Sequence, residues 1–324
     1  MTKTVQSLAG PLETAALGRT LMHEHIFNLT LEVQGAVDGF NGWDEEVEIP
    51  RAQEALRALK AAGYDTLMDL SVIGLGRDVG LIQRAAEGTG MQILLATGLY
   101  TYDVLPRLWH FSGPGTLLGG DEPLDAIFRR DIEEGFGETG VKAAMLKCAV
   151  DAPGMTEHVE RVLRACCRVH GETGTPITVH THPETRRGLD ALRVLGEEGV
   201  DPTRVMLAHC GDSTDLDYLE ELAQSGATLG FDRFGLEVLL PTEARVATVA
   251  AMVERGYADQ MILSHDAISF TDWFPPGMKE QIAPNWHWLH VEQDVLPALR
   301  ARAVTEEQIT TMMVDVPRAF FERG

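Results

Sequence analysis

Apolar residues along the chain follow two alternating patterns, short runs and longer segments with helical spacing. Short apolar runs bounded by polar residues are typical of buried strands. Between them, apolar residues recur on one helical face, as Val159, Val162 and Val169 do. The pattern predicts eight strands, at residues 20–25, 65–70, 92–98, 143–150, 177–180, 205–209, 228–232 and 261–266.

Two of the predicted helices carry signals at their ends. The helix at about 51–62 is expected to end before Gly63, because glycine tolerates the left-handed backbone common after a helix C-terminus. Another helix follows the sixth strand, and Ser213 or Thr214 is expected to cap its first turn.

The alternation of strand and helix predicts parallel strands joined by right-handed crossovers. An open doubly wound sheet would carry a glycine-rich nucleotide loop after its first strand. Here the first strand ends in His23-Glu24-His25 instead. We therefore expect an α/β fold of the (β/α)₈ TIM-barrel type, formed by residues 1–324 as a single domain.

Composition narrows the possible partners. The chain has 324 residues, of which 44% are hydrophobic, and a formal net charge of −22. This charge repels nucleic acids and anionic membranes, so neither is an expected partner. The first residues lack the apolar core of a secretory signal, and no run approaches the roughly 20 apolar residues of a membrane span. With four cysteines, none in a C-x-x-C pair, the protein is expected to be cytoplasmic.

His23 and His25 are the first candidate metal ligands. Side chains alternate between the two faces of a strand, so both imidazoles point the same way and Glu24 points the opposite way. An H-x-H pair alone is also compatible with polar residues at a strand terminus. If the pair binds metal, further ligand residues are expected at the C-terminal ends of other strands.

Three further candidates occupy the same position on other strands. His180 ends the fifth strand, His209 the sixth and Asp266 the eighth. Barrel enzymes place their catalytic groups at the C-terminal ends of the strands. Four histidines and a carboxylate meeting there predict a site for divalent ions such as zinc, cobalt, manganese or iron.

Lys147 ends the fourth strand within an apolar run. An ammonium would be repelled by nearby cations. Two interpretations are open. Lys147 is either a structural or surface lysine, or a neutral amine carboxylated by carbon dioxide, which would convert it into an anionic ligand able to bridge two metal ions.

These residues lie within motifs that resemble the phosphotriesterase family of the amidohydrolase superfamily. The resemblance extends over nearly the whole chain and ends in the segment 314–320. Its main motifs are Gly18-Arg19-Thr20-Leu21-Met22-His23-Glu24-His25, Ala96-Thr97-Gly98-Leu99-Tyr100-Thr101-Tyr102, Leu146-Lys147-Cys148-Ala149, Thr178-Val179-His180-Thr181-His182, His209-Cys210-Gly211-Asp212-Ser213 and Ser264-His265-Asp266.

Within the family, the segment 230–236, with Arg233 at its centre, resembles the phosphotriesterase-like lactonase branch. That resemblance implies a hydrolase that opens N-acyl-homoserine lactones and other lactones, a quorum-quenching activity, with promiscuous cleavage of organophosphate triesters. It also implies two divalent metal ions per chain and a homodimer. The ligands it implies are His23, His25 and Asp266 for the more buried ion, His180 and His209 for the more exposed ion, and carboxylated Lys147 as the bridge.

The resemblance assigns three catalytic residues. Asp266 would accept a proton, and Tyr100 would border the metal ions and meet the lactone. Arg233 would orient Asp266 or line the entrance, although a salt bridge to Asp212 or Asp232 is an equal alternative. Asp212 is also interpreted as a cap of the helix after the sixth strand.

The segment 267–288 is rich in aromatic residues and predicts a long loop that walls an acyl tail or packs against a second subunit. Ile268 departs from the lactonase pattern, which leaves the acyl-chain length open. His182, His265, His287 and His290 are not expected to be ligands, and His265 should face away from Asp266 by strand alternation.

Three rival functions remain. A primary phosphotriesterase shares the fold and the ligands. Another amidohydrolase, such as a dihydroorotase or a deaminase, would differ in metal stoichiometry, because deaminases usually use one metal ion and lack the bridging lysine. A non-catalytic barrel would be expected to have lost ligands, whereas this sequence retains every one that the resemblance implies.

Overall fold

In the computed structural model, which describes residues 3–323, a single curled sheet of parallel strands forms the centre of the molecule. Its nine strands lie in the order β10-β9-β8-β7-β6-β5-β4-β3-β11. Their bounds are β3 Thr20–Asn28, β4 Thr66–Asp69, β5 Gln92–Gly98, β6 Met145–Val150, β7 Ile177–Thr181, β8 Val205–Ala208, β9 Thr228–Phe231, β10 Met261–Leu263 and β11 Ile268–Thr271. The predicted TIM-barrel fold is confirmed.

The ninth strand exists because the eighth barrel strand is interrupted. β10 pairs with β9, whereas β11 pairs with β3. Between them, the Asp266 N–H donates to the His23 carbonyl at 3.0 Å, and the His25 N–H donates to the Ala267 carbonyl at 2.9 Å. These bonds close the barrel. The prediction of one strand over 261–266 is wrong in its second half, because Asp266 has a φ of +52°, which ends the extended backbone.

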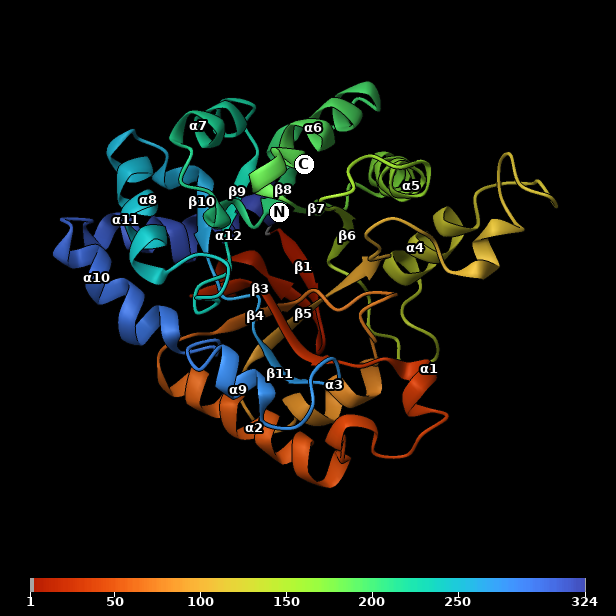
Figure 1. The fold of residues 1–324 in the computed structure, drawn as a ribbon, viewed down its shortest axis with the longest axis horizontal. Coiled ribbons are helices and arrows are strands. Elements are labelled where there is room, and N and C mark those ends of the chain that lie inside the picture. The colour runs from red at the N-terminus through yellow and green to blue at the C-terminus, as the bar shows by residue number, and fades with distance from the viewer. Residues whose placement is uncertain (1–2, 324) are drawn as a thin grey trace.

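The helices lie outside the sheet (Figure 1). Each of the strands β3 to β9 is followed by a helix that returns the chain to the start of the next strand, as right-handed crossovers require. The bounds are α1 Leu31–Gln34, α2 Glu45–Ala61, α3 Val79–Ala86, α4 Pro123–Glu133, α5 Glu157–Thr173, α6 Arg187–Glu197, α7 Leu216–Gln224, α8 Thr242–Glu254, α9 Met278–Ile282, α10 Leu296–Ala301, α11 Glu306–Thr310 and α12 Val316–Glu322. No helix within residues 3–323 combines the length and apolar character needed to cross a bilayer.

Helix ends confirm one prediction and correct two. α2 ends just before Gly63, whose φ is +92°, as expected, but it begins earlier than predicted because Asp44 caps it at Glu45. α7 is capped by Asp215, which accepts a hydrogen bond from the Tyr218 N–H, and not by Ser213 or Thr214. The Ser213 hydroxyl instead accepts from the Asp215 N–H, one turn before the helix.

Alternate residues of each strand enter two separate apolar layers. On β5, Ile93 and Leu95 belong to the layer between the sheet and the helices, whereas Leu94 and Ala96 fill the barrel interior. This period of two is the expected consequence of strand geometry. Because the helices cover the outward-facing residues, a site at the C-terminal strand ends must be formed by inward-facing residues.

An antiparallel hairpin, absent from the sequence prediction, closes the other end of the barrel. It consists of β1 Thr4–Ser7 and β2 Gly10–Glu13, and the Leu8 N–H after β1 donates to the Ile93 carbonyl at 2.8 Å. Val5 from β1 and Phe320 from α12 both pack in the interior layer. The N-terminal end of the barrel is therefore filled, and the polar residues gather at the opposite end.

Candidate metal centre and active site

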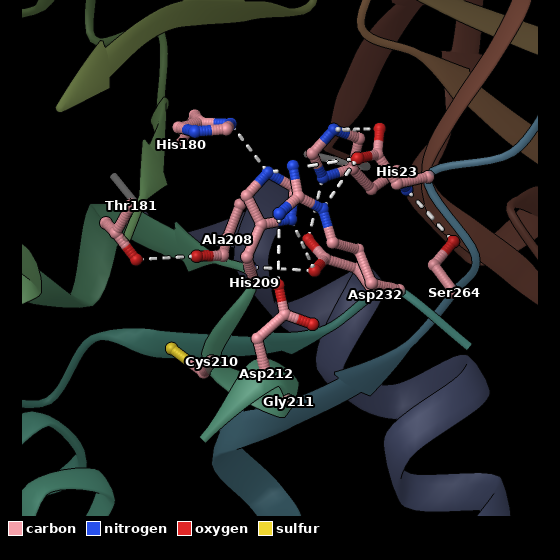
Figure 2. Close-up of polar contacts among 12 residues, drawn as sticks. His23, His180, Thr181, Ala208, His209, Cys210, Gly211, Asp212, Asp232 and Ser264 are labelled. Atoms are coloured by element: carbon pink, nitrogen blue, oxygen red, sulfur yellow. Dashed lines mark hydrogen bonds and ion pairs between the residues drawn. The ribbon is translucent and has the colours of Figure 1, made fainter. Parts of the chain in front are cut away.

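Six side chains predicted to bind metal meet at the C-terminal end of the barrel. They come from β3, β6 and β7, from the turn after β8, and from the junction of β10 and β11. Five of them are buried, and Asp266 is partly exposed. Figure 2 shows three of the histidines, His23 from β3, His180 from β7 and His209 from the turn after β8. The set is His23, His25, Lys147, His180, His209 and Asp266.

A distortion of β3 helps to aim its two histidines. The pairing of β3 with β4 shifts register between Leu21 and Glu24, so that β3 contains one extra residue there. Met22 can therefore fill the barrel interior while His23 and His25 both face the site. Glu24 points the other way, as strand alternation predicted.

The inward-facing nitrogen and oxygen atoms lie within a few ångströms of one another. Asp266 Oδ1 is 3.2 Å from His23 Nε2 and 3.1 Å from His25 Nε2. His209 Nε2 is 2.8 Å from His180 Nδ1 and 3.9 Å from Asp266 Oδ2. Ligand atoms of His23, His209 and Asp266 all lie within 4.8 Å of one another, a spacing that one ion can span.

Asp232 fixes two of these histidines from behind. Its Oδ2 accepts from His23 Nδ1 at 2.7 Å, and its Oδ1 accepts from His209 Nδ1 at 3.0 Å and from the His209 N–H at 2.7 Å. Figure 2 shows the carboxylate between the two rings. Because a carboxylate only accepts, both Nδ1 atoms must carry the proton, which leaves both Nε2 lone pairs facing the centre.

The other two histidines are held in the same manner. His25 Nδ1 lies 2.9 Å from the Ser71 hydroxyl, and His180 Nε2 contacts Asp151 Oδ2 in a short hydrogen bond. In His25 the Nδ1 atom bonds the protein and Nε2 faces the centre, whereas in His180 it is Nε2 that bonds the protein and Nδ1 that faces the centre. Each imidazole thus has one nitrogen tied to the protein and one aimed inward.

This donor set fits divalent metal ions. Burial lowers the pKa of His23 to about 4, with Lys147 acting in the same direction, and burial also lowers the pKa of His180 and His209. When the rings are neutral and their outer nitrogens carry the protons, the inner nitrogens direct lone pairs at one another. The closest such pair is His209 Nε2 and His180 Nδ1, 2.8 Å apart. A cation between them removes that repulsion, and imidazole with carboxylate suits borderline divalent ions.

Asp232→Asn is expected to weaken metal binding about 10- to 100-fold, the usual cost of losing a partner that orients a metal-binding histidine. An amide cannot accept from His23 and His209 with both of its head atoms, so one ring loses its orientation. Competition with a chelator measures the affinity. Asp259→Asn on the surface is the matched control, and equal affinities in the two variants would contradict the assignment.

Lys147 is buried among these ligands. Its Nζ lies 3.0 Å from His23 Nε2. Burial lowers the pKa of Lys147 to about 8, although Asp266 and Asp232 oppose that change. The interpretation of Lys147 as a surface lysine is therefore wrong, because its side chain is buried with the amine beside His23.

Arg233 connects Asp266 to a second carboxylate. Its Nε donates to Asp266 Oδ2 at 3.0 Å and its Nη1 donates to Asp212 Oδ2 at 3.0 Å. Two of the sequence alternatives for Arg233 thus occur together. Burial alone would raise the pKa of Asp266, but His23, His25 and Arg233 hold it well below its usual range.

The interpretation of Asp212 as a helix cap is wrong. Asp212 lies in the short helix Cys210–Asp212, before α7, and its other oxygen forms a short ion pair with the buried Arg245 of α8. Arg245 also donates to the Gly211 carbonyl at 2.9 Å. Each oxygen of this carboxylate is therefore paired with one arginine, and Asp215 caps α7 instead.

Tyr100 borders the cluster after β5. Its hydroxyl lies 3.4 Å from His180 Nδ1, and its ring meets Tyr102 edge-to-face at 5.2 Å. Burial raises the pKa of Tyr100 well above its usual value, so its hydroxyl keeps its proton at neutral pH and can donate a hydrogen bond. It lines a cavity of about 110 Å³, whose other lining residues include His25, Lys147, His180, His209, Asp266, Arg233, Tyr102, Leu236, Leu239, Ile268, Trp273 and Trp286.

The four histidines that were not expected to be ligands, His182, His265, His287 and His290, do not point into the cluster. His265 Nδ1 lies 2.7 Å from Glu24 and His265 Nε2 accepts from the Val291 N–H at 2.9 Å, so it faces away from the site as predicted. His182 bonds Thr185, and His290 pairs with Asp294. His287 lines a separate cavity beyond Trp286.

Several residues of the site were not predicted from the sequence. Asp232 ends the seventh strand, and the same strand-end rule that identified His209 could have identified it. Ser71 and Asp151 each follow a strand end directly and carried a weaker signal of the same kind. Arg245 lies in the middle of α8, where no local pattern marks it.

A parallel barrel with four buried histidines and a partly exposed carboxylate at its C-terminal rim is the architecture of a metal-dependent hydrolase. Comparison with known proteins supports the same class of protein. The model of the phosphotriesterase family matches residues 3–321, and the chain belongs to that family.

Three relatives illustrate the similarity. A phosphotriesterase homology protein of Mycobacterium tuberculosis is 52% identical over 97% of this chain and 96% of its own length. An aryldialkylphosphatase of Saccharolobus solfataricus is 34% identical over 96% of each chain. The solved structure of the phosphotriesterase from Mycobacterium tuberculosis superposes with a TM-score of 0.97 at 51% identity, covering 99% of this chain and 98% of its own.

Proposed function

We propose that this hydrolase opens lactones, N-acyl-homoserine lactones among them, and cleaves organophosphate triesters more weakly. The observation that carries the proposal is the position of the Tyr100 hydroxyl, 3.4 Å from His180 in a cavity of about 110 Å³. A planar lactone carbonyl can reach the Tyr100 hydroxyl over the cluster, and apolar side chains of the same cavity, Leu236 and Ile268 among them, can line its single acyl arm. Tyr100 then supplies a hydrogen-bond donor beside the carbonyl oxygen.

The residues present can hold two divalent ions, of zinc, cobalt, iron or manganese. His23, His25 and Asp266 would hold one ion, His180 and His209 the other, and carboxylated Lys147 would bridge them. When bound, such ions supply a hydroxide nucleophile at neutral pH and polarise a carbonyl or phosphoryl oxygen.

Carboxylation of Lys147 accounts for a buried amine among metal ligands. The neutral amine attacks carbon dioxide, an N–C bond forms, and one proton leaves to solvent, so that the product is an anionic carbamate. The 3.0 Å distance from Lys147 Nζ to His23 Nε2 supports this proposal, because two added oxygens would extend into the centre of the cluster. A carbamate would also remove the cation that otherwise repels metal ions.

The chain's own residues then carry out the proton transfers. Asp266 accepts the proton of the nucleophile at Oδ2, where Arg233 Nε holds the carboxylate at 3.0 Å. The new C–O bond forms at the lactone carbonyl, the ring C–O bond breaks, and Asp266 returns the proton to the departing alkoxide. Tyr100 donates a hydrogen bond to the oxygen on which negative charge develops.

A primary aryldialkylphosphatase is the second candidate, because a relative at 34% identity bears that name. The two candidates differ in kcat/KM for N-decanoyl-homoserine lactone and for paraoxon on one preparation. We expect the lactone value to be higher by about 100-fold, equivalent to ~3 kcal/mol of transition-state stabilisation. A higher value for paraoxon would favour the phosphatase.

Tyr100→Phe serves as the matched variant in that comparison. It keeps the aromatic wall of the cavity and removes only the donor. We expect kcat for the lactone to fall by about 10-fold or more while metal content is unchanged. An equal loss on both substrates would show that the hydroxyl does not distinguish them.

We also propose that the protein is a homodimer. The segment between β5 and α4 reaches away from the barrel (Figure 1) and exposes large apolar side chains, including Leu117 at 82% and Leu118 at 72%. Exposed apolar patches of this kind favour burial against a partner.

A further inference from the structure

Asp266 adopts a backbone conformation that is uncommon for residues with side chains. Its φ is +52°, in the left-handed region that glycine enters freely and aspartate only occasionally. Strained residues of this kind persist only where the surrounding structure holds them in place. The backbone contacts of Asp266 and of its two neighbours, His265 and Ala267, identify what holds it.

Glu24 holds the amide side of this turn. Its Oε1 accepts from the His265 N–H at 2.9 Å, and its Oε2 accepts from the Ala267 N–H at 2.8 Å. The Ser264 hydroxyl also donates to Oε1 at 2.7 Å. The carboxylate between the two β3 histidines therefore spans Asp266 on the outer face of the sheet.

Two tryptophans hold the carbonyl side. The Trp286 indole N–H donates to the His265 carbonyl at 3.0 Å, and the Trp288 indole N–H donates to the Ala267 carbonyl at 3.2 Å. Both side chains are buried. The carbonyls before and after Asp266 are thus each fixed by one indole.

The segment that delivers the indoles is itself tied to the same turn. The Val291 N–H donates to His265 Nε2, whose Nδ1 bonds Glu24. Trp286 lines the cavity that contains the cluster, and with Trp288 it also lines a second cavity of about 410 Å³ beside α2. The position of residues 286–291 therefore affects the orientation of the Asp266 carboxylate, because hydrogen bonds join this segment to the turn.

We propose that Trp286 and Trp288 are positioning residues, which hold Asp266 in its left-handed conformation through their indole N–H groups. The inference rests on the proposed role of Asp266 as metal ligand and proton acceptor. Without the Trp286 donor, the peptide before Asp266 is held only by the Asp266 N–H bond to the His23 carbonyl. Without the Trp288 donor, the Ala267 carbonyl is held only by the His25 N–H. Either loss loosens the turn, and the carboxylate moves away from His23, His25 and Arg233.

Trp286→Phe and Trp288→Phe test this inference, because phenylalanine keeps an aromatic wall and removes the donor. We expect each change to weaken Co²⁺ binding about 10-fold in chelator competition and to lower kcat to a similar extent, with KM little changed. The absorption bands of bound Co²⁺ should shift as well. Trp43→Phe, which alters an indole packed against Phe27 and Phe270 away from the site, should leave all of these unchanged.

A double-mutant cycle separates positioning from general packing. In an Asp266→Asn background, Trp286→Phe should weaken Co²⁺ binding no further, because the residue through which it acts is already altered. Independent, additive losses would overturn the inference, as would wild-type Co²⁺ affinity in both single variants. If Trp286→Phe does not fold, as judged by its thermal unfolding, Trp288→Phe provides the same cycle.

The metal-binding readout requires no substrate, so the two proposals can fail separately. A protein that hydrolyses neither lactones nor phosphotriesters would contradict the proposed function while the cycle still reports on the tryptophans. Additive effects on Co²⁺ affinity in an active lactonase would reject the positioning role alone.

Discussion

Replacement of Asp266 by asparagine is expected to lower kcat for lactone opening by about 100- to 10,000-fold, the range typical for loss of a general base. Asparagine keeps the shape of the side chain but cannot accept the nucleophile's proton. It also loses the ion pair with Arg233, whose Nε lies 3.0 Å from the carboxylate. Steady-state kinetics on N-decanoyl-homoserine lactone, with metal content measured on the same sample, checks the prediction.

Asp212→Asn provides a graded comparison. It removes the second carboxylate on Arg233 while Asp266 keeps its proton-accepting oxygen. Its effect on kcat should be much smaller than that of Asp266→Asn. Near wild-type turnover of Asp266→Asn with its metal retained would remove Asp266 from the mechanism.

Replacement of Lys147 by methionine is expected to remove at least one of the two proposed metal ions and nearly all activity. Methionine matches the apolar stem of lysine and packs well in a buried strand, so the fold should survive. It cannot form a carbamate, however, and the bridge between the two ions would be lost. Elemental analysis after dialysis against metal-containing buffer gives the stoichiometry.

Lys142→Met, in the irregular segment before β6, is the control for that experiment and should keep full metal content. Reconstitution of metal-free wild-type protein should also be faster with added bicarbonate, an effect that Lys147→Met should lack. Full metal content and full turnover in Lys147→Met would show that the lysine has only a structural role.

The sequence was sufficient for those parts of the fold and site that follow from local periodicity. Apolar runs placed the barrel strands, and the strand-end position brought His180 and His209 to one rim, because parallel strands share their C-terminal edge. The opposite orientations of Glu24 and His25 followed from the strand period alone. Each of these inferences needed only a short window of sequence.

Contacts between distant segments could not be predicted in this way. The interruption of the eighth strand depends on Asp266, whose left-handed backbone is held by Glu24 and by indoles about twenty residues away along the chain. The use of one carboxylate, Asp232, by two histidines requires three strands to be in register. Asp212 was misread for the same reason, because its partner Arg245 lies on another helix.

The most direct test of this account is a crystal structure of the protein grown with zinc, with anomalous diffraction recorded at the zinc edge. We expect two anomalous peaks about 3.5–4 Å apart, enclosed by His23, His25, His180, His209 and Asp266. We also expect density extending from Lys147 Nζ to both peaks. A single peak, or an unmodified Lys147 directed away from the peaks, would contradict the proposed two-metal centre.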